Sequence, residues 1–369
     1  MLPPVNPAPG ATRRRFLRLG GLAASLAWAQ APFVRALAHS PPFPDYPFPL
    51  GVASGDPSPD GFVLWTRLAP RPLEDGGGLG GEPIEVRWEL AEDEGFRRTI
   101  RRGTVIAQAW WAHSVHVEVG GLRPDRWYWY RFLAGGEVSP VGRTRTAPPA
   151  GAAVDRLRFA FASCQHYETG LYTAYEHLRQ DDVDLVFHLG DYIYEYGVEK
   201  GRVRAHRGPE IKTLQQYRNR HALYRMDPAL QAVHAAAPWV VTWDDHEVDN
   251  NYAGGISEEA RVRPAELLKR RAAAYRAYYE HLPLRRSQLP AGAGLRLFRE
   301  IPWGRLARFL VLDTRQYRTD QPCCDGNQPP CADSLRPDAT LLGTAQRDWL
   351  FRRSAAPGAA WNVLAQQVM

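Results

Sequence analysis

The sequence has no apolar run long enough to cross a bilayer and no acidic residue near its start. The apolar run at 19–34 has 16 residues, whereas a spanning helix needs about 20. Residues 1–38 contain five arginines and no Asp or Glu, and without these five charges the formal net charge of +6 becomes +1. The remainder is nearly neutral, which argues against a membrane anchor and against a nucleic-acid-binding surface.

Other absences exclude further classes of protein. The glycine-rich stretch 76–81 lacks the Lys-Ser/Thr ending of a phosphate-binding loop, so a nucleotide-binding site of that type is not expected. The segment 51–55 (GVASG) misses the G-x-S-x-G register by one residue, which disfavours a serine esterase. Position 250 is Asn, so the HE pair at 246–247 does not continue into the zinc motif H-E-x-x-H.

Residues 1–38 have the three parts of an export signal. A basic segment at 12–18 (TRRRFLR) resembles the twin-arginine signature and precedes the apolar run, which ends near the small-x-small sequence 36–38 (ALA). We therefore predict a twin-arginine signal peptide at 1–38, the twin-arginine translocase as partner, and a periplasmic or extracellular protein. The alternative interpretation is a disordered basic tail.

Three of the four cysteines, Cys323, Cys324 and Cys331, cluster near prolines. In an oxidising compartment one pair of them can close a small loop. A zinc site is less favoured because no histidine lies nearby, and which two cysteines pair stays open. Cys164 lies apart and follows an apolar segment (161–165, FASCQ). It is a buried thiol, a nucleophile or a metal ligand, although no phosphate-cradling loop follows it.

The hydrophobic pattern changes near a proline-rich linker at 147–151. Before it, short alternating segments predict a β-sandwich of the fibronectin/Ig-like kind at 39–147, in which a tyrosine after the 122–125 corner bonds back to the loop. After it, strands and helices alternate, which predicts an α/β domain at 152–369. The expected strands are 61–65, 84–90, 113–119, 127–132, 157–162, 183–189, 239–243, 296–300 and 306–313. The expected helices are 172–179, 228–236, 257–279 and 346–355, the last with Thr344 as a possible cap.

Polar residues directly follow two apolar strands. The segment 188–196 (HLGDYIYEY) delivers Asp191 and Tyr194, and 243–251 (WDDHEVDNN) delivers Asp245 and His246. Open α/β sheets place their sites at such carboxyl ends. Carboxylate oxygens bind hard cations, a phenolate binds ferric iron, and an imidazole can protonate a leaving group. Turn and cap residues in the core are the alternative interpretation.

A third strand end, 311–320 (VLDTRQYRTD), contains Asp313 and Arg315. An arginine can hold phosphate oxygens bidentately and stabilise charge in a transition state. A surface ion pair is the alternative interpretation for either residue.

These motifs, from 51–57 (GVASGDP) to 361–367 (WNVLAQQ), resemble in order those of the PhoD-like alkaline phosphatases. The resemblance implies a fibronectin-like domain followed by a metallophosphoesterase domain of the αββα-sandwich type, with one iron (Fe3+) and two calcium ions. It implies a phosphate-ester substrate hydrolysed by attack of a metal-bound hydroxide. The roles that it implies are iron ligands at Cys164 and Tyr194, bridging carboxylates at Asp191 and Asp245, calcium support from Asp313, and phosphoryl contacts from His246 and Arg315.

The sequence also departs from that family. Asp245 stands where Asn is usual, and no histidine follows His281, whereas such sites take late histidine ligands. We therefore expect a metallophosphoesterase domain that is incomplete at its C-terminus, with an open sheet edge. Two alternatives are kept: an enzyme like the purple acid phosphatases, which share the Gly-Asp-x-x-Tyr pattern, and a non-catalytic exported binding protein with a relic metal site.

Overall fold

The computed structural model describes residues 43–326 and 328–367. The predicted signal peptide at 1–38 lies outside the described residues. The stretch Phe43–Met369 forms one compact unit. Within the described ranges, no helix has the length and apolar character needed to cross a membrane.

The largest sheet takes strands from both predicted domains. Its strand order is β5-β2-β1-β11-β10-β9. The strands are β1 Val52–Ser58, β2 Gly61–Arg67, β5 Ser114–Val119, β9 Phe159–Ala162, β10 Leu185–Leu189 and β11 Trp239–Thr242. The two halves join where Gly55 of β1 pairs in parallel with Trp239 of β11. The predicted division into 39–147 and 152–369 therefore separates stretches of sequence that share a sheet.

A second sheet packs on the N-terminal half of the first. It consists of β3 Ile84–Ala91, β4 Thr99–Ala107, β6 Trp127–Ala134, β7 Glu137–Val138 and β8 Gly142–Arg145. Alternate residues of both sheets form one buried core, for example Leu64 and Val117 against Val86 and Phe132. The predicted tyrosine corner is confirmed, because Tyr128 donates its hydroxyl proton to the carbonyl of Arg123 at 3.1 Å.

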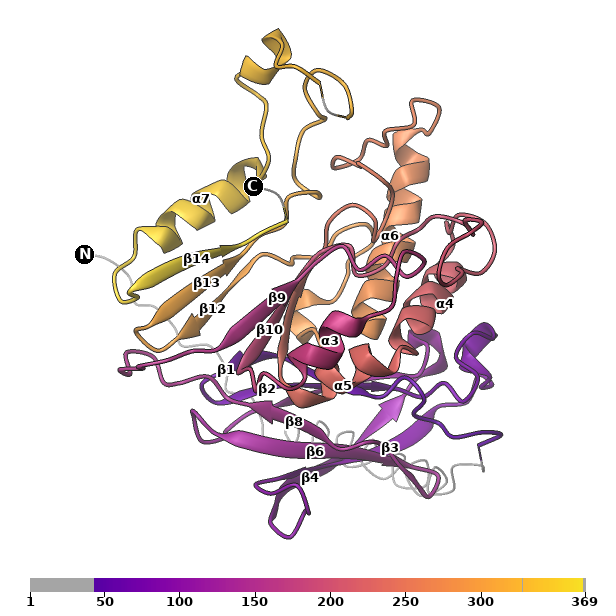
Figure 1. Cartoon of the computed structure of the whole chain (residues 1–369), viewed down its shortest axis with the longest axis vertical. Coiled ribbons are helices and arrows are strands. Elements are labelled where there is room, and N and C mark those ends of the chain that lie inside the picture. Colours follow the sequence, from indigo (N-terminus) through magenta and orange to yellow (C-terminus); the bar gives the residue numbers. More distant parts are fainter. Residues whose placement is uncertain (1–42, 327, 368–369) are drawn as a thin grey trace, which may run out of the picture. The chain divides into compact units, whose positions relative to one another are not determined.

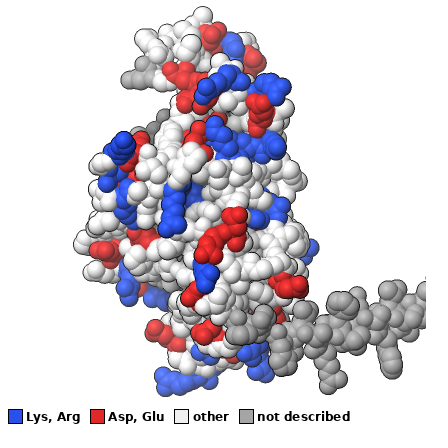
Figure 2. Space-filling view, turned by 90° about the vertical axis from the view of Figure 1, so that its right-hand side faces the viewer, with Lys and Arg blue, Asp and Glu red and all other residues white. Residues whose placement is uncertain are grey.

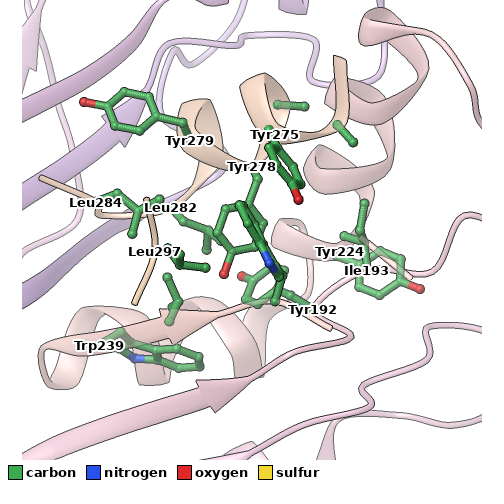
Figure 3. Packing of buried hydrophobic residues seen from close by; sticks show 14 of the residues in the cluster. Tyr192, Ile193, Tyr224, Trp239, Tyr275, Tyr278, Tyr279, Leu282, Leu284 and Leu297 are labelled. Carbon is green, nitrogen blue, oxygen red and sulfur yellow. The ribbon is translucent and has the colours of Figure 1, made fainter. Parts of the chain in front are cut away.

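Helices cover one face of the parallel strands β9–β11 (Figure 1). They are α3 Thr173–Leu178, α4 Leu214–Arg225, α5 Pro228–Ala236 and α6 Pro264–His281. Figure 3 shows Tyr275 and Tyr278 of α6 pointing into this core with Tyr192 and Trp239, whereas Tyr279 points away from them. The core is rich in tyrosine, so the hydroxyl groups also connect it to neighbouring loops.

The other face of the parallel strands packs on a three-stranded sheet. This sheet contains β12 Arg299–Trp303, β13 Ala307–Val311 and β14 Trp361–Ala365, and α7 Gly343–Ser354 lies beside it (Figure 1). Leu185, Phe187 and Val240 face this sheet, whereas Val186 and Val241 face the helices. Strands β10 and β11 are therefore buried on both faces, which explains their continuous apolar sequences.

The helices of the structure differ from the prediction in three respects. The predicted helix 257–279 begins only at Pro264, since Ser257 turns back to donate to Asp249 at 2.7 Å. Helix α4 was not predicted, because it buries polar residues such as His221 and Arg225 and lacks a clear apolar stripe. Thr344 is not the cap of α7: the capping position is Leu342.

Strands β9 and β14 end their sheets within the part of the chain that the structure describes. Both strands expose a large apolar side chain: Phe161 of β9 is 70% exposed and Trp361 of β14 is 67% exposed.

The charged side chains on the face drawn in Figure 2 are of both signs. Lys and Arg alternate with Asp and Glu over this face, and no broad area of one sign is visible there. This face therefore shows no polycationic patch of the kind that binds nucleic acids without sequence preference.

His188 of β10 gives the fold a predictable sensitivity to acid. The side chain is fully buried, and neither ring nitrogen has a hydrogen-bond partner among the described residues. Burial lowers the pKa of His188 to about 3. Between pH 6.5 and pH 3 the His188 side chain binds a proton in the unfolded chain but not in the folded chain. The free energy of unfolding is therefore highest above pH 6.5 and decreases as the pH falls below that value.

We expect His188→Phe to flatten this pH dependence. Protonation of His188 in the unfolded chain should lower the unfolding free energy of the wild type by about 2 kcal/mol between pH 6.5 and pH 5. The decrease measured for the variant should be smaller than that of the wild type by this amount. Urea unfolding at both pH values measures the difference. The exposed His177 provides a matched control, since His177→Gln should leave the pH dependence unchanged; the same flattening in both variants would contradict the assignment.

Candidate metal centre

Two turns after adjacent parallel strands form the floor of the site. The chain turns at Cys164 after β9 and at Asp191 after β10, and both residues have a φ of 55°. Backbone hydrogen bonds join the turns: Cys164 donates to Gly190 and Gln165 donates to Asp191, each at 3.1 Å. Left-handed backbone is uncommon for such residues and clusters at functional sites. The turns therefore place the Cys164 and Asp191 side chains at the same sheet edge.

Gly190 allows the turn after β10 to pass close to the turn after β11. Its φ is 111°, a conformation that side chains other than glycine rarely adopt. A Cβ atom there would lie 2.4 Å from the backbone nitrogen of Asp244 and 2.7 Å from the carbonyl carbon of Trp243. Only glycine permits this approach of the two strand ends.

Asp191 presents a buried oxygen that lacks a partner. The residue is 6% exposed, and its Oδ2 accepts the hydroxyl proton of Tyr194 at 2.9 Å. Its Oδ1 is buried without a hydrogen-bond partner in the described part of the chain. Burial, followed by the nearby charge of Asp245, raises the pKa of Asp191. Burial also raises the pKa of Tyr194 strongly, with Asp191 as the next cause.

Asp245 and His246 come from the turn after β11 and face Asp191. One potential ligand atom from each of Asp191, Asp245 and His246 lies within 4.8 Å of the others. Asp245 is 5% exposed, and its Oδ2 accepts the backbone N–H of Asn251 at 2.7 Å. Two buried carboxylates at this separation repel each other unless a proton or a cation lies between them.

Glu195, a residue that the sequence analysis did not identify, orients His246. Its Oε2 lies 2.8 Å from Nδ1 of His246, and its Oε1 accepts the backbone N–H of Asn250 at 2.8 Å. Burial alone would lower the pKa of His246, but the hydrogen bond and charge of Glu195 raise this pKa to about 9. The ring also stacks on Tyr194, with centroids 4.1 Å apart. The contact with Glu195 therefore fixes the orientation of the His246 ring through Nδ1, and Nε2 takes no part in this contact.

Glu247, also missed in the sequence analysis, fastens the turns after β10 and β11 to each other. It is 1% exposed and accepts three backbone N–H groups: those of Tyr192 at 2.6 Å, Asp244 at 2.9 Å and Asp191 at 3.1 Å. Burial raises its pKa. Because all three contacts are to the backbone, the role of Glu247 is to position the ligand-bearing turns.

Arg315 reaches the same site from the segment after β13. Its Nε donates to Oδ1 of Asp244 at 2.5 Å, and its Nη2 lies 3.3 Å from Oδ1 of Asp245. The remaining nitrogen, Nη1, is buried and has no partner among the described residues. Arg315 therefore carries a positive charge to the carboxylates of Asp244 and Asp245, and the N–H groups of its Nη1 have no acceptor among the described residues.

Asp313 is not brought into this group. It is fully buried, and its Oδ1 accepts the backbone N–H groups of Arg315 at 3.0 Å and Gln316 at 2.9 Å. Its Oδ2 accepts from the side chain of Gln316 at 3.0 Å. A metal-ligand role for Asp313 stays a prediction, whereas the described contacts support a role in positioning Arg315.

Cys164 is an exposed free thiol, so the interpretation as an inert buried thiol is wrong. Partial burial raises its pKa, and Asp191 and Tyr194 are among its neighbours. In the second cysteine group, Cys323 and Cys331 form a disulfide and Cys324 is free and exposed. This pairing answers the question that the sequence left open.

His166, Glu168 and His206 form a second group of possible ligands, and two of them have hydrogen bonds within the chain. The hydroxyl oxygen of Tyr224 accepts two backbone N–H groups at 3.1 Å each, so its proton points to Nε2 of His206, 3.0 Å away. Glu168 accepts the backbone N–H of His206 at 2.7 Å. Glu168 and His206 therefore hold the neighbouring loops together, whereas Nδ1 of His166 is buried and has no hydrogen-bond partner among the described residues.

The residues at the first group fit a metal ion. The unpartnered oxygen of Asp191, its close approach to Asp245, and the adjacent thiol and phenol form a donor set of oxygen and sulfur atoms. Hard cations favour the carboxylates, and iron also accepts thiolate and phenolate. A cation would remove the repulsion between the two carboxylates.

The strand ends of a mixed sheet thus bring together side chains that can bind a metal ion, as in a metal-dependent enzyme. The family model described as "PhoD-like phosphatase" matches residues 159–369, and "PhoD-like phosphatase, N-terminal domain" matches residues 34–148. The chain belongs to the PhoD-like phosphatase family.

Individual relatives support this membership. Alkaline phosphatase D of Bacillus subtilis (strain 168) is 55% identical over 365 residues, which are 96% of this chain and 62% of the relative. A solved structure of PhoD is 57% identical with a TM-score of 0.87, over 89% of this chain and 64% of that one. A purple acid phosphatase from yellow lupin seeds has a TM-score of 0.50 at 14% identity, over 87% of this chain and 51% of that one, and shares the fold alone. The chain spans about three fifths of the length of the two PhoD relatives.

Proposed function

We propose that the chain carries the active site of a metal-dependent phosphoesterase that hydrolyses phosphate esters. The observation that supports this most strongly is the convergence of an acidic pair, Asp191 and Asp245, with His246 and Arg315 at one sheet edge. Membership of the PhoD-like family agrees with the proposal. The proposed substrate is a phosphate ester, the same class of substrate that the resemblance to the PhoD-like family implies.

The proposed cofactors are iron (Fe3+) and calcium (two Ca2+). Cys164 and Tyr194 would hold iron with Asp191, and Asp191 and Asp245 would bridge neighbouring ions. Asp313 is the proposed calcium ligand. To bind calcium, its carboxylate would have to give up its hydrogen bonds to the backbone N–H groups of Arg315 and Gln316. When bound, the ions supply an activated water and neutralise charge on the phosphate.

The chain's own groups would then orient the substrate and move a proton. Arg315, fixed by Asp244 and Asp245, would donate its available Nη1–H to a phosphate oxygen. His246, whose pKa is raised by the hydrogen bond and charge of Glu195, would donate a proton from Nε2 to the leaving oxygen. Both side chains are preorganised by carboxylates, so little reorganisation is needed during the reaction.

We also propose export through the twin-arginine translocase to the periplasm or the extracellular space. This proposal depends on residues 12–18 and on the small-x-small sequence at 36–38.

Tyr194→Phe tests the metal assignment. Iron held by a phenolate absorbs visible light, so we expect the iron-loaded wild type to be coloured and the variant to lose that band and about 90% or more of its activity, because removing a ligand weakens the iron site. Absorption spectra, stoichiometric metal analysis and hydrolysis of bis-p-nitrophenyl phosphate are the measurements. The exposed Tyr46, changed in the same way, is the control. A wild type that takes up no stoichiometric metal would instead favour a non-catalytic protein with a relic site.

A further inference from the structure

A groove lined by aromatic side chains lies where β4 and β5, the end strands of their two sheets, meet α6. Its lining comes from these three elements, from the 3-10 helix Ala109–Trp111 and from the 3-10 helix Arg286–Gln288. The volume is about 890 Å³, within the range of about 300–1,000 Å³ that is usual for ligand sites. None of the described residues of the candidate metal centre lines this aromatic groove, so any ligand in it binds at a separate site.

Four aromatic rings follow one another along the aromatic groove. The ring centroids of Trp110 and Trp111 are 5.2 Å apart, and those of Trp111 and Tyr279 are 5.7 Å apart. His116 stacks on Tyr279 at 4.5 Å, and Figure 3 shows Tyr279 pointing away from the helix-covered core. Trp110, at one end of the row, is 61% exposed. A single exposed apolar residue is ordinary, but an exposed ring that continues a row of rings in a groove indicates a binding surface.

The turn that carries Trp110 and Trp111 is held in place by side chains from other elements. Arg218 of α4 and Arg276 of α6 both donate to the backbone carbonyl of Trp110, Arg218 at 3.1 Å. Ser114 of β5 donates from Oγ to the carbonyl of Trp111 at 2.9 Å. Because the backbone is fixed, the exposed ring is positioned before a ligand arrives, which reduces the entropic cost of binding.

The polar groups of the aromatic groove are balanced in charge. Among the described lining residues, Glu118 and Arg286 carry charges, one of each sign, and Glu118 also accepts the backbone N–H of Arg286. Ser114 and Ser287 add hydroxyl groups to the lining. A lining of this kind offers hydrogen bonds without a net charge, which matches an uncharged ligand rather than a polyanion or a polycation.

A sugar ring in its pyranose form has C–H groups on its faces and hydroxyl groups around its edge. The C–H faces pack on aromatic rings, and the hydroxyl groups exchange hydrogen bonds with polar side chains beside those rings. In a chain of sugars, successive units can contact successive aromatic rings. We propose that the aromatic groove binds a neutral polysaccharide, with Trp110 stacking on one sugar and with Glu118 and Arg286 bonding to hydroxyl groups. The inference does not depend on the proposed phosphoesterase function.

Isothermal titration of the full chain with chitohexaose and with cellohexaose, two neutral oligosaccharides, tests the inference. The wild type should bind at least one of them, and Trp110→Ala should weaken this binding at least about 10-fold, because the exposed ring supplies the stacking surface. Trp110→Phe should recover part of the loss. Arg286→Ala should weaken binding about 2- to 10-fold through the lost hydrogen bond. Both side chains are exposed, so thermal unfolding of these variants should match that of the wild type.

Trp361 offers a matched control, because it is 67% exposed on β14 and does not line the aromatic groove. Trp361→Ala should bind the oligosaccharide as the wild type does, and equal losses in the Trp110 and Trp361 variants would overturn the inference. Absence of binding to both oligosaccharides would also overturn it, as would tighter binding of poly-L-proline, which aromatic grooves of another kind recognise. A dimer that sedimentation detects and that Trp110→Ala abolishes would assign the groove to self-association instead. Hydrolysis of bis-p-nitrophenyl phosphate by Trp110→Ala should equal that of the wild type, so the two proposals can fail separately.

Discussion

Asp191→Asn is expected to remove bound metal and phosphoesterase activity together, with kcat/KM at least about 1,000-fold lower. Asp191 supplies the unpartnered buried oxygen of the site and faces Asp245. The neutral amide can still accept from Tyr194, and it removes the repulsion between the two carboxylates. The chain without metal should therefore be at least as stable as wild type, so loss of metal is distinguishable from loss of fold.

Arg315→Ala should behave differently. This variant is expected to keep its metal and to lose turnover by about 100- to 1,000-fold, because it removes a charge-stabilising donor and no ligand. Metal analysis and steady-state kinetics on both variants make the comparison. Asp182, which is exposed and pairs with Arg143, supplies the Asp→Asn control. If the Asp191 and Arg315 variants lose metal equally, the division of roles is wrong.

Gly190→Ala is expected to destabilise the fold by roughly 3 kcal/mol or more. The added Cβ would lie 2.4 Å from the nitrogen of Asp244, against a backbone that cannot move independently of β11. The φ of 111° adds conformational strain. Relief of the clash would separate the two turns that carry Asp191 and Asp245, so metal affinity should fall as well. Urea unfolding at neutral pH measures the loss of stability.

Gly201 separates strain from steric conflict. Its φ is also positive, 78°, but no heavy atom lies within 4 Å of the position of its Cβ. Gly201→Ala should therefore cost only about 1 kcal/mol, from the backbone conformation alone. Equal destabilisation of the two variants would show that close approach of the strand ends does not determine the requirement for glycine.

Elements with strong local signals were predictable from the sequence. The helix 228–236 was placed at its observed bounds, because Pro228 occupies the first turn and Asp227 caps the N–H groups of Ala229 and Leu230. Strand β6 alternates cleanly between half-buried and buried residues, and its prediction needed no tertiary information. The pairing of β1 with β11 was not predictable, since neither sequence specifies a partner that far away.

The site shows the same division. The strand-end position of Asp191, Asp245 and His246 follows from apolar runs that stop at polar residues, and the structure brings these three together. Glu195 and Glu247 were missed, although both lie within the motifs that were examined for ligands. Their roles depend on contacts with backbone groups and with His246 across 50 or more residues, which residue spacing does not encode.

The shared sheet has a consequence for the nascent chain. The edge of β1 at Gly55 stays uncovered until Trp239 of β11, about 180 residues later in the sequence, has been synthesised and can pair with it. At about 5–20 residues per second, the ribosome needs on the order of 10 to 40 s to make that stretch. Throughout this interval β1 and β2 present an open strand edge, which can pair with another chain. A protein built in this way would benefit from a chaperone that holds its first strands until β11 has been synthesised.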